Sequence, residues 1–257
     1  MSEFRVVAMI PARMASSRFP GKPLARLLGM TMVEHIYRRC ELSRKTNEVY
    51  VATPDQDIAE EVKSFGGKFI MTSPLHKRAC DRVAEASLSV EADVVVTVQG
   101  DEPLIAPQMI DIAVEVLMAD QETVCVNLAT QATDDEANDP NEVKVVTDSR
   151  GYALYFSRAA IPTNLRGEGD ASFLKQLCII PMTKDFLQTF IGLSPTPLEI
   201  SESVDMLRLL EHGYKVKIVK SEKQVKSVDT SEDLTIAEKL LSHDPILKFY
   251  HDIEHTK

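Results

Sequence analysis

The most informative residues of this chain are basic ones that lie close together near its start. Between Phe4 and Val33 the sequence has no Asp or Glu, although the whole chain has a formal net charge of -10. The basic residues of this stretch are Arg5, Arg13, Arg18, Lys22 and Arg26. Arginine, lysine and free backbone N–H groups bind phosphate oxygens, so the stretch predicts a polyphosphate-binding loop. By spacing alone, an ordinary solvated basic loop remains an alternative.

Two carboxylates could bind the metal ion that accompanies a polyphosphate. Asp101 follows the Val-rich run 93–98, and Asp229 precedes a helix-like segment. Magnesium prefers oxygen ligands and commonly takes one or two carboxylates together with substrate phosphates, so the pair predicts a Mg²⁺ site. Taken singly, Asp101 also fits a turn before Pro103, and Asp229 also fits a helix N-cap.

The elements that must position these residues alternate between strand and helix patterns. Strands are expected at 4–10, 48–53, 67–71 and 93–98, and helices at 31–43, 55–65 and 80–90. This order predicts an α/β fold with a mostly parallel, Rossmann-like sheet. Ligands of such sheets bind beyond the carboxyl ends of the strands, where the basic loop and Asp101 would both emerge.

The second half of the chain changes pattern. Strand-like runs at 124–130, 142–147 and 151–156 predict mixed or antiparallel pairing, and a helix at about 199–212, a strand at 215–219 and a helix at 231–241 follow. We expect a single domain over 1–257, in which roughly 130–200 forms an inserted mixed α/β lobe that binds sugar or mediates dimerisation.

Composition and cysteine spacing exclude several classes. The acidic balance argues against a general nucleic-acid binder, which needs a broad positive surface. Four scattered cysteines without a C-x-x-C pair disfavour a zinc ribbon or a disulfide scaffold, and no apolar run approaches membrane-spanning length. The G-x-S-x-G, Walker and G-x-G-x-x-G motifs are absent. We expect a cytoplasmic protein that is not inserted in a membrane.

Several motifs together resemble one enzyme family. The run from Ile10 to Leu24, I-P-A-R-M-A-S-S-R-F-P-G-K-P-L, is similar to the nucleotide loop of sugar nucleotidyltransferases. With V-Q-G-D-E-P at 98–103, Y-F-S-R-A-A-I-P at 155–162, P-L-E at 197–199 and V-D-T at 228–230, the chain resembles the 3-deoxy-manno-octulosonate (Kdo) cytidylyltransferases over about residues 4–241.

The resemblance implies a Mg²⁺-dependent cytidylyltransferase that transfers CMP from CTP to the anomeric hydroxyl of an acidic eight-carbon sugar and releases pyrophosphate. It implies catalytic roles for Arg13, Lys22 and Asp101 and metal binding by Asp101 and Asp229. The residues it implies in substrate binding are Arg18, Arg82, Gln99, Arg158, Glu199 and Glu202. A homodimer and a role in lipopolysaccharide precursor activation are implied as well.

Departures from the family pattern leave the acceptor open. Arg78, Ala79 and Cys80 replace small, hydroxyl-bearing residues, and the segment from Gln176 to Met182 lacks an expected His and two Tyr. The first change leaves base selection or the local loop geometry open. Because the second removes polar groups from the acceptor side, we expect the 8-amino-3,8-dideoxy analogue of Kdo as the sugar. Ordinary Kdo, another acidic sugar, and a catalytically inactive nucleotide- or sugar-binding regulator are the alternatives.

Overall fold

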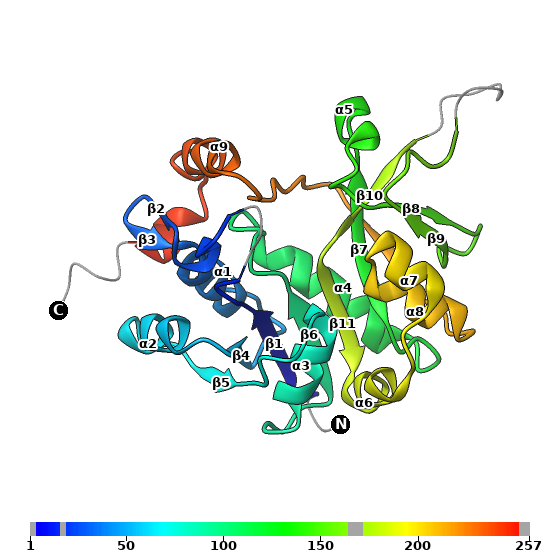
Figure 1. The fold of residues 1–257 in the computed structure, drawn as a ribbon, viewed down its shortest axis with the longest axis horizontal. Coiled ribbons are helices and arrows are strands. Elements are labelled where there is room, and N and C mark those ends of the chain that lie inside the picture. The colour runs from blue at the N-terminus through cyan, green and yellow to red at the C-terminus, as the bar shows by residue number, and fades with distance from the viewer. Residues whose placement is uncertain (1–3, 16–18, 164–171, 252–257) are drawn as a thin grey trace. The chain divides into compact units, whose positions relative to one another are not determined.

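The computed structural model describes residues 4–15, 19–163 and 172–251 (Figure 1). The chain divides into two compact units, one formed by Met1–Asp111 with Val225–Lys257 and the other by Ile112–Gln224. The second unit therefore starts earlier and ends later than the expected lobe at 130–200. Its roles in sugar binding and dimerisation stay predictions.

The first unit contains parallel strands in the order β6-β1-β4-β5. Their bounds are Val6–Pro11 for β1, Glu48–Thr53 for β4, Phe69–Met71 for β5 and Val94–Val98 for β6. Every residue of β1 and β6 is buried, as expected for strands covered on both faces. The alternating pattern of the sequence thus predicted the parallel sheet correctly.

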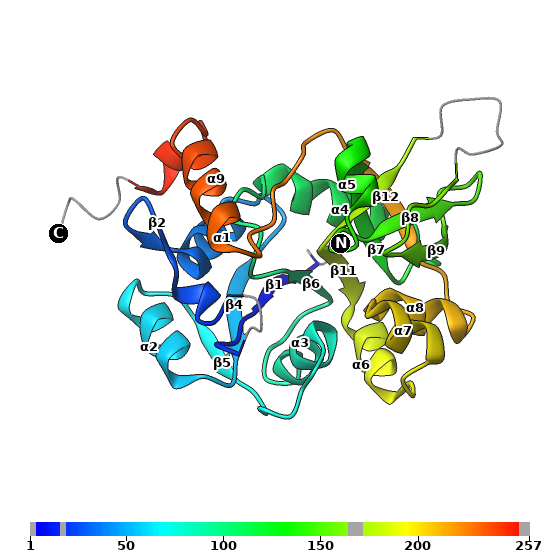
Figure 2. The ribbon, with the colours of Figure 1, turned by 45° about the horizontal axis from the view of Figure 1, so that its top comes forward.

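Helices and short elements complete this unit. Helices α1 (Met32–Glu41), α2 (Gln56–Ser64) and α3 (Ala79–Ser87) pack on its strands. The short 3₁₀ helix η1 (Lys22–Leu24) leads into the hairpin of β2 (Arg26–Leu27) and β3 (Met30–Thr31). After residue 225 the chain forms α9 (Ser231–Leu241) and η2 (Leu247–Phe249), and Figure 2 shows α9 beside β2. Helix α4 (Pro107–Ala119) crosses the boundary between the units.

The second unit is built on a mixed sheet in the order β12-β7-β10-β8-β9. Only β12 and β7 pair in parallel, while the other neighbours are antiparallel, which confirms the expected change of pattern. The strands of this sheet are β7 (Val126–Gln131), β8 (Lys144–Thr147), β9 (Ala153–Ser157), β10 (Leu174–Leu177) and β12 (Lys217–Ser221). Strand β11 (Ile179–Thr183) also lies in this part of the chain but is not a strand of this sheet. Its helices are α5 (Asp134–Asn138), α6 (Lys184–Gly192), α7 (Pro197–Glu202) and α8 (Asp205–Glu211).

One element of the sequence prediction is wrong. The single helix expected at 199–212 is two helices, α7 and α8, because Ser203 has a left-handed φ of 58° that ends α7. A buried ion pair between Glu199 of α7 and Arg208 of α8 joins the two helices across this break. Within the described residues, no helix is long and apolar enough to span a membrane.

Candidate nucleotide-binding site

The site begins where two neighbouring parallel strands end. Strands β1 and β6 run side by side, so the chain leaves both at the same edge of the sheet. Gly100 lies two residues after the end of β6. It approaches the end of β1 so closely that a Cβ at this position would lie 3.0 Å from the carbonyl oxygen of Pro11. Glycine therefore allows the 99–101 segment to lie against the start of the basic loop.

The basic loop is held by backbone contacts at both ends. The Met14 amide donates to the Asp55 carboxylate at 2.7 Å, and the Gly21 amide donates to the Met14 carbonyl at 3.1 Å. Gly21 has a φ of 73°, a left-handed conformation that glycine adopts without strain, and it directly precedes η1. This turn places Lys22 at the first position of η1.

Lys22 lies at the centre of the site. Its Nζ donates to Asp101 Oδ2 at 2.9 Å, to Asp229 Oδ1 at 3.1 Å and to the Val228 carbonyl at 2.9 Å. The two carboxylates, 128 residues apart in sequence, therefore contact one ammonium group. Burial disfavours the charged amine, but the two aspartates outweigh it, so the pKa of Lys22 is raised above its ordinary value.

The segment that carries Asp229 is fixed by further bonds. The Val228 amide donates to the Asp101 carbonyl at 2.9 Å, which ties this segment to the end of β6. Thr230 is the N-cap of α9, and the Asp233 carboxylate accepts from the Asp229 amide and pairs with Lys226. Asp229 is therefore not the cap of α9, and its side chain is directed to Lys22 instead.

A third wall comes from residues 76–82, before and within α3. Arg82 is buried, and its guanidinium donates to the Thr72 hydroxyl and to the carbonyls of Ser73 and His76. Burial, together with the nearby positive charge of Arg13, lowers the pKa of Arg82. The bonds of Arg82 hold the loop that carries His76, whose Nε2 contacts the Glu85 carboxylate.

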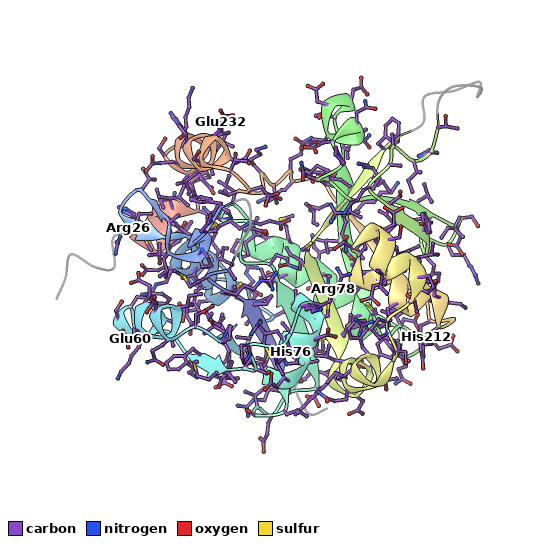
Figure 3. All side chains as sticks on the ribbon, viewed as in Figure 1. Arg26, Glu60, His76, Arg78, His212 and Glu232 are labelled. Atoms are coloured by element: carbon purple, nitrogen blue, oxygen red, sulfur yellow. The ribbon has the colours of Figure 1, made fainter. Side chains whose placement is uncertain are left out.

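These walls enclose a pocket of about 290 Å³ in the first unit. Its charged lining residues are Arg13, Lys22, Lys77, Arg78, Arg82, Asp101 and Asp229, and His76 lines it as well. Figure 3 labels two of these side chains, His76 and Arg78, beside α3. Since cations predominate, the pocket suits a polyanion, and its two carboxylates suit a metal ion bound with that polyanion.

Within the described part of the chain, no group of three or more His, Cys, Asp or Glu side chains could hold a metal ion by itself. Asp101 and Asp229 lie close together, because both carboxylates accept from the same Nζ of Lys22, and both line the pocket. Two carboxylates near a polyphosphate pocket fit the ligand preference of Mg²⁺, which takes its remaining oxygens from phosphates and water.

The predicted residues of the second unit have local partners. Glu202 accepts from the hydroxyls of Tyr155 and Ser157 and from the Arg158 amide, and Arg158 Nε donates to the Glu202 carbonyl at 2.6 Å. These bonds tie the end of α7 to the end of β9.

Glu199 is in a different environment. Its side chain is 1% exposed, and Arg208, which is 3% exposed, binds both of its carboxylate oxygens at 2.8 and 2.6 Å. Glu199 also accepts from the Thr196 amide at the start of α7. These contacts give Glu199 a structural part in joining α7 to α8.

Comparison with known proteins identifies the family. The cytidylyltransferase family model matches residues 7–226. The 3-deoxy-manno-octulosonate cytidylyltransferase of Geobacter metallireducens is 42% identical to this chain. The matched region spans 92% of this chain and 98% of that enzyme. The enzyme of that name from Syntrophotalea carbinolica is 45% identical over 91% of this chain and 97% of its own length. The chain belongs to the 3-deoxy-manno-octulosonate cytidylyltransferase family.

Solved structures agree with this assignment. The structure described as CMP:2-keto-3-deoxy-manno-octonic acid synthetase complexed with CTP matches with a TM-score of 0.87 and 36% identity, covering 93% of this chain and 98% of that one. A cytidylyltransferase from Leptospira borgpetersenii, with a TM-score of 0.62 and 18% identity, shares the fold. The protein is thus a nucleotidyltransferase with the mixed α/β fold expected from its sequence.

The cytidylyltransferase fold brings most of the predicted residues together. The predicted residues that line one pocket are Arg13, Lys22, Arg82, Gln99, Asp101 and Asp229. Arg18 lies outside the described residues, and Arg158, Glu199 and Glu202 belong to the second unit. Their roles in substrate binding stay predictions.

Sequence reasoning missed part of this cytidylyltransferase pocket. Lys77 and Arg78 line it, but the sequence marked Arg78 only as a departure from the family pattern and did not single out Lys77. Their position just before a predicted helix was the available signal, because a helix N-terminus favours bound anions. The Val228 carbonyl was also missed, since a backbone acceptor leaves no trace in the sequence.

Proposed function

We propose that this chain transfers CMP from CTP to the anomeric hydroxyl of a 3-deoxy-octulosonate sugar acid and releases pyrophosphate. The observation that carries the proposal is that Asp101 and Asp229 both form ion pairs with Lys22 inside a basic pocket. The names of the relatives and the CTP-bound state of the similar structure support the same reaction.

In this proposal the nucleotide binds through its triphosphate. Arg13 would hold the phosphate oxygens, the positive charge of Lys22 would attract them, and Arg82 would keep the wall at 72–76 in place. Asp101 and Asp229 would hold a Mg²⁺ ion, whose role when bound is to screen the negative charge of the phosphates.

The bond changes follow from this arrangement. The anomeric hydroxyl loses its proton to water, its oxygen attacks the α-phosphorus, and the bond from that phosphorus to the oxygen of the leaving pyrophosphate breaks. Negative charge then grows on the pyrophosphate oxygens, and the ammonium of Lys22 and the guanidinium of Arg13 stabilise it. Because its pKa is raised, Lys22 is charged at neutral pH.

Kdo is the first acceptor to test, because the relatives carry its name. The 8-amino analogue is a second candidate, and one side-chain arrangement in the second unit is compatible with either sugar. The Asn127 amide nitrogen donates to the carbonyls of Leu128 and Leu177, so its oxygen must accept from the Gln176 amide nitrogen. The oxygen of Gln176 is then left as an acceptor, which suits an amine or a hydroxyl donor.

Pyrophosphate release with CTP and Mg²⁺ tests the proposal, with Kdo and the 8-amino sugar assayed side by side. We expect turnover with at least one sugar, and a loss on the order of a hundredfold or more in Asp101→Asn and Asp229→Asn. Asp111→Asn is the matched control, because Asp111 accepts from Ser43 and Lys45 in the same unit and does not line the pocket. Binding of CTP without product from any acidic sugar would instead support a regulator. Cytoplasmic location, a homodimer and a role in lipopolysaccharide synthesis stay predictions.

A further inference from the structure

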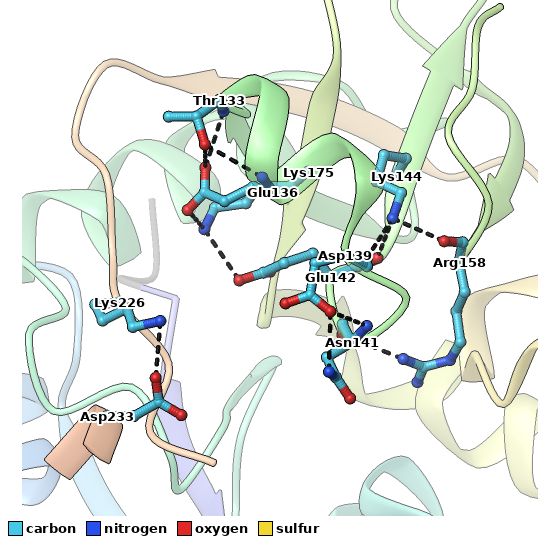
Figure 4. Close-up of polar contacts among 10 residues, drawn as sticks. All are labelled: Thr133, Glu136, Asp139, Asn141, Glu142, Lys144, Arg158, Lys175, Lys226 and Asp233. Carbon is cyan, nitrogen blue, oxygen red and sulfur yellow. Dashed lines mark hydrogen bonds and ion pairs between the residues drawn. The ribbon is translucent and has the colours of Figure 1, made fainter. Parts of the chain in front are cut away.

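An unusual contact set surrounds the loop 139–142 of the second unit, between α5 and β8 (Figure 4). All four consecutive carbonyl oxygens of this loop accept hydrogen bonds from two cationic side chains. Lys144 Nζ donates to the carbonyls of Asp139 and Glu142, both at 2.7 Å. Arg158 Nη1 donates to the two carbonyls between them, those of Pro140 at 2.9 Å and Asn141 at 3.2 Å.

Lys144 also holds Arg158 directly. Its third bond goes to the Arg158 carbonyl at 2.8 Å, so one ammonium joins the loop to the end of β9. Lys144 is 0% exposed, and burial together with the charge of Arg158 lowers its pKa. An ammonium has three N–H donors, and all three are used here. Lys144 therefore has no donor left for a ligand and acts only through the groups it holds.

Arg158 is held in position by neutral acceptors. Its Nε and Nη1 donate only to backbone carbonyls, those of Glu202, Pro140 and Asn141. Among residues 4–15, 19–163 and 172–251, no carboxylate forms an ion pair with its guanidinium, and its Nη2 donates no hydrogen bond. Arg158 as a whole residue is half-buried, so a fixed positive charge with an unused N–H edge remains. Such an edge is suited to a carboxylate.

The family resemblance already implies Arg158 in substrate binding, and we infer that Lys144 is its positioning residue, which fixes the Nη2 edge of Arg158 for the carboxylate of the acceptor sugar. The inference rests on the proposed function. Lys144 sets the shape of the 139–142 loop and the backbone of Arg158, and the loop in turn orients the guanidinium. The ligand chemistry is that of a sugar acid, in which a carboxylate lies next to the reacting anomeric centre.

The test compares Kdo with its methyl ester as ligands of the whole protein, measured by isothermal titration in the presence of CTP and Ca²⁺. The wild type should bind the acid tighter than the ester by on the order of ten- to hundredfold, as expected for one charge-assisted contact. Arg158→Gln and Lys144→Met should both bring this ratio close to one. The KM for CTP should stay unchanged in both variants.

Lys175→Met is the matched control. Lys175 is 1% exposed and pairs with the carboxylates of Glu136 and Glu142, so it is an equally buried lysine near the same loop. We expect this variant to lose stability but to keep the acid-to-ester ratio. If Lys144→Met does not fold, Lys144→Arg is measured, because it keeps the charge but cannot present three N–H groups to the same three carbonyls.

The outcomes distinguish a failure of the proposed function from a failure of the positioning role of Lys144. If the wild type binds and converts no octulosonate acid, the proposed function fails. If it converts the sugar while Lys144→Met or Lys144→Arg keeps the wild-type acid-to-ester ratio, the positioning role is wrong. If Lys175→Met lowers the ratio as much as Lys144→Met, the effect belongs to the stability of the unit and the inference is also wrong.

Discussion

A buried histidine predicts how the stability of the first unit depends on pH. His35 of α1 is 0% exposed, with Nε2 at 2.8 Å from the Leu27 carbonyl and Nδ1 at 2.9 Å from the Tyr250 hydroxyl. A carbonyl can only accept, so Nε2 carries the proton and Nδ1 accepts from Tyr250. The Tyr250 oxygen in turn accepts from Arg39 Nε at 3.0 Å. The network thus fits a neutral His35.

The size of the effect follows from the pKa. Burial, with smaller contributions from the charges of Arg39 and His251, lowers the pKa of His35 from 6.5 to about 4. Between these values the unfolded chain binds a proton that the folded chain does not, so stability is full above pH 6.5 and falls as the pH falls. At about pH 5 the loss should be roughly 2 kcal/mol, and below about pH 4 it should level off near 3 kcal/mol.

Urea unfolding followed by far-UV circular dichroism at about pH 8 and about pH 5 measures this loss. The matched variant is His35→Gln, whose amide keeps an N–H for the Leu27 carbonyl but does not titrate. The quantity compared is the change in unfolding free energy between the two pH values, since the variant shifts the absolute stability. We expect this change to be about 2 kcal/mol smaller in the variant. An equal change in both proteins would refute the reasoning.

Three further variants test the roles of single residues. Glu199→Gln should cost about 3–5 kcal/mol of stability, seen as a lower melting temperature, because it leaves Arg208 buried without its partner. The KM for CTP should not change in this variant, and a rise would show that Glu199 takes part in binding CTP. Gly100→Ala should weaken CTP binding in titration calorimetry, because its Cβ would lie 3.0 Å from the Pro11 carbonyl oxygen, and unchanged affinity would contradict this. Lys22→Met should lower product formation on the order of a hundredfold or more with an unchanged circular dichroism spectrum, and near wild-type turnover would exclude a catalytic role.

Much of the fold could be predicted because its signals are local. The buried strands β1 and β6 are continuous apolar runs in the sequence, and Thr230 begins α9 with a capping box. The break between α7 and α8 could not be predicted in this way. It depends on the left-handed Ser203 and on the Glu199–Arg208 ion pair, and neither a backbone angle nor a tertiary contact is visible in residue types alone.

The site could be predicted in part for a similar reason. Asp101 and the basic loop follow neighbouring parallel strands, so sheet topology brings them to one edge. Asp229 reaches the same ammonium because Val228 bonds the end of β6, a contact that only the folded chain reveals. The loop bonds of Arg82 and the carbonyl bonds of Lys144 are equally hidden, because a sequence shows that a side chain is charged but not which backbone oxygens it binds.

The central claim is that Asp101 and Asp229 bind a divalent ion together with the triphosphate of CTP in the pocket around Lys22. Isothermal titration of CTP with and without Mg²⁺, on the wild type and on the double variant Asp101→Asn with Asp229→Asn, tests it most directly. We predict that Mg²⁺ tightens CTP binding to the wild type and that this gain disappears in the double variant. An equal gain from Mg²⁺ in both proteins would contradict the claim.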